Sequence, residues 1–380
     1  MGRALREIEI LTTQFSRKFL TFWAFALLLP SSIHAQNQGR TLLPEVDAYL
    51  RSVYPADEPG AAVIVMRGGK VIHRSAYGMA DLELGVLLSP DMVFQIGSLT
   101  KQFTAAAILI LQQRGKLSIN DPVTKYFPEF PAIARKITLQ NLLTHTSGLL
   151  EYAQVENFRP NIVRQDTTPT ELLRVFRDKP LYFEPGDEYR YNNSGYAMLG
   201  AIIELLSGDS YADFVRDEIF LRLGMKNTQF GGSQIVPGRV SGYSGSSGSY
   251  QNAGYVSPTQ PYAAGALMST LDDLARWDHA LVTGAIPGVS YESMGKRFAL
   301  NDGTEIDYGY GLAYMDIASR EVIGHGGGYS GFTALSFRIP DHDVYVALLI
   351  NAPGKKPNRS EVANNLVAIV VRSIVAETGD

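Results

Sequence analysis

The stretch FQIGSLTKQFTAAAILILQQ, residues 94–113, is the part of the sequence that decides the fold. After Ser98 its apolar residues recur at helical spacing, and Gly115 stands where a helix C-terminal cap is expected. The pattern therefore predicts a helix from Leu99 to Arg114. Ser98 and Lys101 are three residues apart, so they share one face of its first turn.

Lys101 occupies a position that a helix disfavours for a cation. The N-terminal end of a helix carries partial positive charge, which costs a cation there about 0.3–1 kcal/mol. The same field, together with burial, favours a neutral amine that can accept the proton of the Ser98 hydroxyl. The Ser98 amide, at the helix N-terminus, can also help to bind an oxyanion. The plain alternative is a serine N-cap followed by a solvated lysine.

A second Ser-x-x-Lys stands at Ser293 and Lys296. It contains Gly295, and no clean amphipathic run follows it. We interpret this copy as coincidence.

Composition describes an ordinary soluble globular protein of one large or two smaller domains. The 380 residues are 45% hydrophobic and 19% charged, with a net charge of −4. So slight a charge argues against nucleic acid or an anionic membrane as a partner. The chain has no cysteine, which excludes disulfides, thiol catalysis and thiolate metal sites. It has neither His-Glu-x-x-His nor a dinucleotide-binding glycine pattern in context, so we expect no metal and no organic cofactor.

The N-terminus has the layout of a secretory signal. Arg17 and Lys18 precede an apolar run over residues 19–29, Pro30 ends it, and Ala35 is a small residue suited to cleavage. The run is too short to span a bilayer. We expect residues 1–35 to be a signal peptide and the chain to be exported, periplasmic or secreted, with no stable membrane span. A buried helix is the alternative.

The rest of the chain predicts strands near both ends and helices between them. Helices are predicted over 43–53, 99–114, 137–149, 170–177, 196–207, 211–223, 271–281 (with Ser269 as its cap) and from Ser360 onward. Strands are predicted over 61–66, 71–76, 311–316, 334–339 and 344–351. Residues 231–258, rich in Gly, Ser and Tyr, predict a long surface excursion. This order indicates an α+β fold, an antiparallel sheet covered by the terminal helices with a mostly helical lobe inserted.

The stretch PGDEYRYNNSGYAMLG, residues 185–200, places a small polar cluster before a predicted helix. Tyr191 and Asn193 are therefore expected on a loop. A tyrosine that packs its ring and bonds any acceptor is the alternative for Tyr191. A second Tyr-x-Asn occurs at Tyr250 and Asn252.

The stretch GHGGGYSGF, residues 324–332, lies just before a predicted strand and contains the only His-x-Gly of the chain, His325 to Gly327. Its glycines allow a ligand to approach the backbone closely, and exposed N–H groups there can bind an oxyanion. The alternative is a flexible connector with an incidental histidine.

Taken in order, Ser-x-x-Lys, Tyr-x-Asn and His-x-Gly resemble the serine β-lactamase-related hydrolases, especially the branch of class C β-lactamases, DD-peptidases and their esterase relatives. The framing residues match as well: FQIGSLTKQFTA, LLTHTSGL, PGDEYRYNNSGYAMLG, GALMSTLDDLARW and GHGGGYSGF. The resemblance runs from about Leu43 to the last helix. It implies a β-lactamase/transpeptidase-like fold and a single catalytic domain over residues 36–380. Its α/β lobe would cover about 40–95 and 264–380, and its helical lobe about 96–263.

The resemblance also implies catalytic roles. Ser98 would be the acylated nucleophile and Lys101 its proton partner. Tyr191 would share general acid–base work. Asn193 would hydrogen-bond the substrate amide or the catalytic side chains. His145, in LLTHTSGL, would hold a loop together with Ser147.

The remaining carried-over positions bind substrate. His325 and Gly327 would line the cleft at the sheet edge, and the N–H groups of Ser98 and Gly328 would form the oxyanion hole. Well-studied β-lactamases of this branch carry lysine where this chain has His325, and that lysine helps to recognise the substrate carboxylate. Histidine at this position is found in many esterase-like and peptidase-like relatives.

The resemblance thus favours an exported serine hydrolase that acts on small-molecule or peptide esters and amides. The alternatives are a class C-type β-lactamase or DD-carboxypeptidase and, from another class, a penicillin-binding sensor module that acylates without turnover. The sequence carries no signal for an oligomeric state.

Overall fold

The computed structural model describes residues 43–155 and 163–378. The described residues belong to one compact unit. The expected signal peptide, residues 1–35, lies outside them. Among the described residues, no helix combines the length and the apolar character needed to cross a bilayer.

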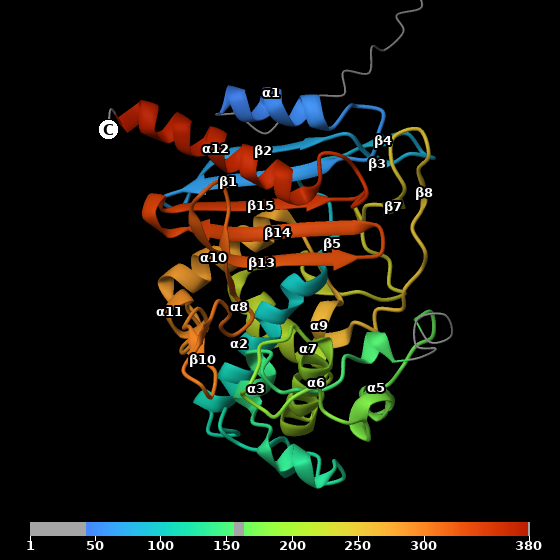
Figure 1. Cartoon of the computed structure of the whole chain (residues 1–380). Helices are drawn as coiled ribbons and strands as arrows, with labels where there is room; N and C mark the ends of the chain where they lie inside the picture. The colour runs from blue at the N-terminus through green and yellow to red at the C-terminus, as the bar shows by residue number, and fades with distance from the viewer. Residues whose placement is uncertain (1–42, 156–162, 379–380) are drawn as a thin grey trace, which may run out of the picture. The chain divides into compact units, whose positions relative to one another are not determined.

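The largest sheet has six antiparallel strands in the order β12-β13-β14-β15-β1-β2 (Figure 1). The strands are β1 (Ala61–Arg67), β2 (Lys70–Tyr77), β12 (Ala313–Asp316), β13 (Glu321–Tyr329), β14 (Phe332–Ile339) and β15 (Val344–Ile350). β1 pairs with β15, with Val63 opposite Leu348, so the two ends of the described chain meet in the middle of the sheet. The predicted α+β class is confirmed.

Both faces of this sheet are covered. Helices α1 (Pro44–Val53) and α12 (Arg359–Thr378) lie together over one face, as Figure 1 shows. Along β1, Val63 and Val65 pack with these two helices, whereas Ala62 and Ile64 pack with the helices on the opposite face. Because successive side chains alternate between two buried faces, β1 is apolar without interruption.

The stretch around Ser98 forms a 3₁₀ turn, η1 (Gly97–Leu99), followed by helix α2 (Thr100–Gln113). Gly115 at φ +67° lies just beyond its C-terminus, where a left-handed residue is favoured. The predicted apolar stripe understates the burial, since every residue from Thr100 to Leu111 is buried. Small residues, Ala105 to Ala107, allow α6 (Asn193–Ser207), α7 (Tyr211–Val215) and α9 (Tyr262–Gly265) to pack around α2.

Three predicted helices differ from the structure. Thr138 caps α3 (Leu139–Leu143) as expected, but α3 ends five residues before Gly148 because His145 adopts φ +60°. Thr270, and not Ser269, caps α10 (Leu271–Thr283). The predicted helix over 211–223 continues from α7 through a π-helical turn, η5 (Arg216–Phe220), into α8 (Leu221–Leu223).

Most of the glycine-rich stretch expected before β14 is itself a strand, since residues 324–329 belong to β13 and only Ser330 and Gly331 form the turn into β14. The remaining helices are η2 (Val123–Lys125), η3 (Ala132–Lys136), η4 (Tyr152–Gln154), α5 (Pro169–Arg177), α11 (Tyr291–Met294) and η6 (Pro340–His342). The remaining short strands are β3 (Met79–Asp81), β4 (Val86–Leu87), β5 (Phe94–Gln95), β6 (Gln229–Phe230), β7 (Tyr243–Ser244), β8 (Gln251–Asn252), β9 (Leu267–Ser269), β10 (Phe298–Ala299) and β11 (Glu305–Ile306).

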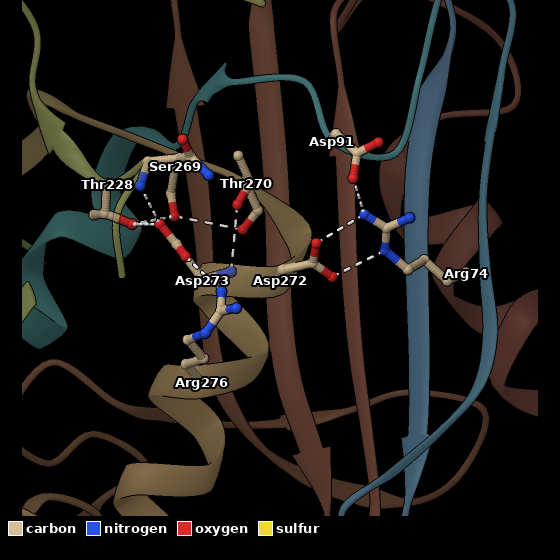
Figure 2. Close-up of polar contacts among 9 residues, drawn as sticks. Arg74, Asp91, Thr228, Ser269, Thr270, Asp272, Asp273 and Arg276 are labelled. Carbon is tan, nitrogen blue, oxygen red and sulfur yellow. Dashed lines mark hydrogen bonds and ion pairs between the residues drawn. The ribbon is translucent and has the colours of Figure 1, made fainter. Parts of the chain in front are cut away.

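A small three-stranded sheet, β5-β9-β6, connects the helical part to the start of α2. Phe94 of β5 lies opposite Ser269 of β9, so the residues before Ser98 run beside the residues after α9. Polar contacts at the N-terminus of α10 hold this region, as Figure 2 shows. Asp273 accepts hydrogen bonds from the Asn227 amide at 2.8 Å and the Thr228 hydroxyl at 2.9 Å.

The neighbouring residue of α10 ties the same helix to the large sheet. Asp272 accepts two hydrogen bonds from Arg74 of β2, at 2.9 and 2.7 Å, and Arg74 also pairs with Asp91 (Figure 2). The N-terminus of α10 is thus fixed on both sides. We interpret this cluster as structural support for β9.

Candidate active site

Lys101 projects from the first turn of α2 into a fully buried position. Its Nζ lies 3.3 Å from Ser98 Oγ, 2.8 Å from Asn193 Oδ1 and 2.8 Å from the carbonyl oxygen of Ala264. Three elements therefore converge on one amine: η1 with the serine, the start of α6 with the asparagine, and α9 with the carbonyl.

These partners determine how a neutral amine would be oriented. The amide oxygen of Asn193 and the carbonyl oxygen of Ala264 can only accept hydrogen bonds. A neutral Lys101 has two N–H donors, and both are used on these two acceptors. Its lone pair is then left for the third neighbour, the Ser98 hydroxyl. The geometry can therefore make Lys101 the acceptor of the Ser98 proton.

The electrostatics of the site favour that neutral amine near neutral pH. Burial lowers the pKa of Lys101 to about 7, and the Glu151 carboxylate opposes this shift. A lysine whose pKa lies near the working pH can both take up and return a proton, which is the requirement for a general base that later acts as an acid.

Tyr191 lies on the loop before α6, and its ring covers the amine. The ring centroid is 4.7 Å from Lys101 Nζ and 4.4 Å from the centroid of the His145 ring. Burial raises the pKa of Tyr191, while a hydrogen bond with the Ser98 hydroxyl acts in the opposite direction. The side chain is nevertheless 38% exposed, because it also lines the open cleft. Tyr191 is thus a neutral phenol in contact with both Ser98 and substrate space.

The residues after Tyr191 differ from the expected loop. Asn192 is the N-cap of α6, accepting from the Gly195 amide at 2.9 Å, and Asn193 is the first residue of the helix. The backbone N–H of Asn192 donates to His145 Nδ1 at 3.1 Å, and its side chain donates to the Leu149 carbonyl at 2.7 Å. The His-Thr-Ser-Gly stretch thereby fixes the start of α6, which agrees with the loop-holding role expected for His145.

The Gly327–Gly328 peptide gives β13 an amide directed at η1, the turn that contains Ser98. Gly327 O accepts from Thr333 Oγ1 at 3.1 Å and from Arg359 Nη1 at 3.0 Å, so it points toward β14. A trans peptide places the following N–H on the opposite side. The Gly328 N–H therefore points to the edge that β12 leaves unpaired, since β12 pairs with β13 over 321–324.

Glycines make the close approach of η1 and β13 possible. A Cβ on Gly97, at φ +53°, would lie 2.5 Å from Gly328 O, and a Cβ on Gly327 would lie 1.9 Å from Ile96 O. Any side chain at Gly97 or Gly327 would force the two backbones apart. Because η1 and β13 approach this closely, the N–H groups of Ser98 and Gly328 belong to neighbouring backbone segments, as two donors to one oxyanion must.

His325 is buried and has both ring nitrogens engaged. Nε2 lies 2.9 Å from the Tyr308 hydroxyl, and Nδ1 lies 2.5 Å from Gly326 O. A carbonyl can only accept, so the ring proton is on Nδ1 and Tyr308 donates to Nε2. Burial, followed by the charge of Lys101, lowers the pKa of His325 to about 3. The single N–H of the neutral His325 ring is therefore already used within the protein.

The cleft over these groups has a volume of about 660 Å³. It is lined by Tyr191, residues 325–328, Thr333, Pro353 and residues 358–360. Among the described residues, no cluster of His, Asp or Glu has the arrangement needed to hold a metal ion. Tyr191, whose ring covers the Lys101 amine, and Gly328 both line this cleft, so we take the cleft as the candidate space for a substrate carbonyl.

The two decoy motifs, which are the second Ser-x-x-Lys at Ser293 and the second Tyr-x-Asn at Tyr250, lie elsewhere. Ser293 belongs to a capping box with Ser290, and its hydroxyl donates to the Gly288 carbonyl at 3.0 Å. Lys296 is exposed, with its Nζ 5.7 Å from the centroid of the Phe298 ring. Tyr250 donates to Glu58 at 3.2 Å. None of these side chains contributes to the cleft.

Sequence reasoning missed Glu151. This buried carboxylate accepts a hydrogen bond from the backbone N–H of Asn193 at 2.5 Å, and its charge raises the pKa of Lys101 against the effect of burial. The available signal was an acid directly after the His-Thr-Ser-Gly-Leu-Leu stretch, in a segment that otherwise forms the core.

Comparison with known proteins places these observations in a family. The family model described as Beta-lactamase matches residues 51–370. Penicillin-binding protein 4* of Bacillus subtilis is 31% identical over 306 residues, covering 76% of this chain and 67% of that protein. The match to protein flp of Staphylococcus aureus spans only 35% of that protein, so the chain corresponds to part of some relatives.

Solved structures show the same likeness. A penicillin-binding protein homologue from Pyrococcus abyssi, described as octameric, has a TM-score of 0.73 and 27% identity, covering 87% of this chain and 77% of that one. A D-amino acid amidase from Ochrobactrum anthropi, solved with L-phenylalanine amide, has a TM-score of 0.72 and 26% identity, covering 88% and 99%.

Proposed function

This chain belongs to the beta-lactamase family and is a serine hydrolase of that family; from that premise we propose that it cleaves esters and amides through an acyl-enzyme on Ser98. Lys101 and Tyr191 share the proton transfers. Asn193 holds the amine, and the amides of Ser98 and Gly328 bind the oxyanion.

One observation carries the proposal. The buried Lys101 amine is bound on two sides by groups that only accept hydrogen bonds, and Ser98 Oγ lies 3.3 Å away on the third. With a pKa of about 7, the amine is available as a base at neutral pH. A solvated lysine beside an N-cap serine, the plain alternative, would have neither feature.

The reaction proceeds in two steps. As Ser98 Oγ forms a bond to the substrate carbonyl carbon, its proton moves to Lys101 Nζ, and the carbonyl oxygen becomes an oxyanion between the two backbone amides. The leaving group departs with a proton, which the phenol of Tyr191 can deliver and recover from Lys101. In the second step water takes the place of the leaving group and attacks the acyl-enzyme. The proton transfers run in reverse order, and Ser98 is freed.

Two features support uncharged esters and amides as substrates. His325 is neutral and has no free N–H, so it offers a substrate carboxylate neither charge nor a hydrogen bond. The solved relative named as a D-amino acid amidase supports the inclusion of amides.

A second candidate, a β-lactamase or DD-carboxypeptidase acting on anionic substrates, is favoured by Arg359. Its guanidinium lines the same cleft and would supply the positive charge that His325 lacks. Against this, Arg359 Nη1 is already bound to Gly327 O, Thr333 Oγ1 and Ala334 O.

Active-site labelling combined with a substrate panel tests the proposal. A fluorophosphonate probe should add one label to the purified protein, Ser98→Ala should abolish it, and the matched Ser293→Ala should leave it intact. Short-chain p-nitrophenyl esters and D-amino acid amides should be turned over faster than a chromogenic cephalosporin or a D-Ala-D-Ala peptide. Labelling without turnover of any substrate would instead identify an acylated sensor, and labelling that survives Ser98→Ala would refute the assignment.

A further inference from the structure

Glu151 is a buried acid next to the proposed proton relay. It is 8% exposed and lies at the start of η4, after the His-Thr-Ser-Gly stretch. Its Oε2 accepts from the Asn193 amide at 2.5 Å, and its Oε1 accepts from the Ala153 amide at 3.2 Å. Among the described residues no salt bridge pairs this carboxylate with a cation. Burying a carboxylate without a paired cation costs folding free energy, and residues that carry such a cost are expected at functional sites.

A single residue separates this carboxylate from the catalytic amine. Asn193 donates its backbone N–H to Glu151 and accepts, through its side-chain oxygen, from Lys101 Nζ at 2.8 Å. Glu151 therefore fixes the residue that orients the amine. Because the surroundings are buried, a charge in this position also acts on the amine more strongly than it would in water.

We propose that Glu151 is a positioning residue for acyl transfer at Ser98: it fixes Asn193, and its negative charge stabilises the ammonium that forms when Lys101 takes the Ser98 proton. In that step the Oγ–H bond breaks, an Nζ–H bond forms, and Oγ bonds the carbonyl carbon. The amine becomes a cation inside the protein, and Glu151 supplies the compensating charge. This inference rests on the proposed function.

The other groups around Lys101 do not supply that charge. The rings of Tyr191 and Tyr196 lie 4.7 and 5.3 Å from Nζ, and burial raises the pKa of both phenols, which keeps them neutral. Burial lowers the pKa of His145 and of His325, so both imidazoles are neutral near pH 7 as well. Glu151 is the carboxylate that raises the pKa of Lys101 against the effect of burial.

The test is the pH dependence of the rate constant for fluorophosphonate labelling of Ser98. The acid limb is the part of this pH profile where the rate constant falls as Lys101 becomes protonated. In Glu151→Gln it should move to lower pH by at least about 0.5 unit, because the ammonium loses a neighbouring opposite charge. In Glu151→Asp, which keeps the charge, the limb should stay at the wild-type position even if the plateau falls. Glu184→Gln, an exposed glutamate that pairs with Lys136, is the matched control and should leave the limb unmoved.

The outcomes are distinguishable. If Glu151→Gln labels more slowly with its limb unmoved, Glu151 only caps α6 and the inference is overturned. If Glu151→Gln does not fold, Glu151→Asp decides, since a displaced limb in that charge-conserving variant overturns the inference and an unmoved limb supports it. If no variant and no wild-type protein is labelled at Ser98, the proposed function itself fails.

Discussion

Replacing Lys101 by methionine should make the protein more stable relative to wild type as the pH falls. Methionine fills a similar volume without a charge. In the folded state the pKa of Lys101 is lowered to about 7, from an ordinary value of 10.5. Between these two values the unfolded chain holds a proton that the folded chain does not, so wild-type stability rises with pH through this window. The free-energy penalty of burying Lys101 is full below its pKa in the folded state. It is relieved as the pH approaches the pKa of the unfolded chain.

The magnitude follows from the linkage relation. A shift of 3.5 units corresponds to a full penalty of about 5 kcal/mol. Between about pH 7.5 and about pH 9.5, wild type should gain about 2–3 kcal/mol relative to Lys101→Met. The hydrogen bonds to Asn193 and Ala264 are lost at every pH, so their cost offsets the two curves without changing this slope.

Urea unfolding at a series of pH values measures the difference. Trp277 is buried and donates to Gln102 of α2 at 2.8 Å, so its fluorescence reports on the packing of that helix. Lys296→Met, at the exposed lysine of the decoy motif, is the control and should follow wild type in parallel. Parallel curves for wild type and Lys101→Met would refute the depressed pKa, and with it the argument that Lys101 is a base near pH 7.

The remaining predictions concern activity. Lys101→Ala and Tyr191→Phe should each lower kcat by about 10²-fold or more, and the double variant should be little worse than the poorer single one, since both act in one relay; fully multiplicative losses would contradict a shared role. kcat/KM should rise with pH through a limb near 7, which is set by the pKa of Lys101. His325→Gln should leave that limb in place, because the pKa of His325 is about 3 and its ring is already neutral at that pH. Gly327→Ala should abolish fluorophosphonate labelling, because its Cβ would lie 1.9 Å from the carbonyl oxygen of Ile96, just before η1. Gly328→Ala should retain labelling, because no atom lies within 4 Å of the position of its Cβ. His325→Lys should shift the ratio of kcat/KM values toward a chromogenic cephalosporin by about ten-fold or more, since a charge-assisted hydrogen bond is worth about 1.5–3 kcal/mol; an equal loss on ester and cephalosporin would contradict this.

Local sequence signals were sufficient for the turn that contains Ser98 and Lys101 and for much of the fold. The serine and lysine three residues apart do lie on one turn, with 3.3 Å between Oγ and Nζ. The cation at a helix start was itself the informative misfit, because α2 buries that lysine completely. Helices with clear caps, such as α3 after Thr138, were found at their starts.

What local signals could not supply was tertiary contact. The proximity of Asn193 and Lys101, 92 residues apart, depends on α6 packing against α2, and only the family resemblance predicted it. β13 was not predicted as a strand because glycine has a low strand propensity. The structure explains the exception, since Gly327 has no space for a side chain. Glu151 was missed because one acid in a core segment acquires meaning only through its contact with Asn193.

The burial of α2 from Thr100 to Leu111 has a consequence for how this protein loses activity on heating. Since every residue from Thr100 to Leu111 is buried, with α6, α7 and α9 packed against the helix, its amide protons should exchange with solvent only through global unfolding. Fraying of the termini and opening of loops elsewhere should leave Ser98 and Lys101 in place relative to each other. On heating, hydrolytic activity and native structure should therefore be lost together, with no folded but inactive intermediate between them.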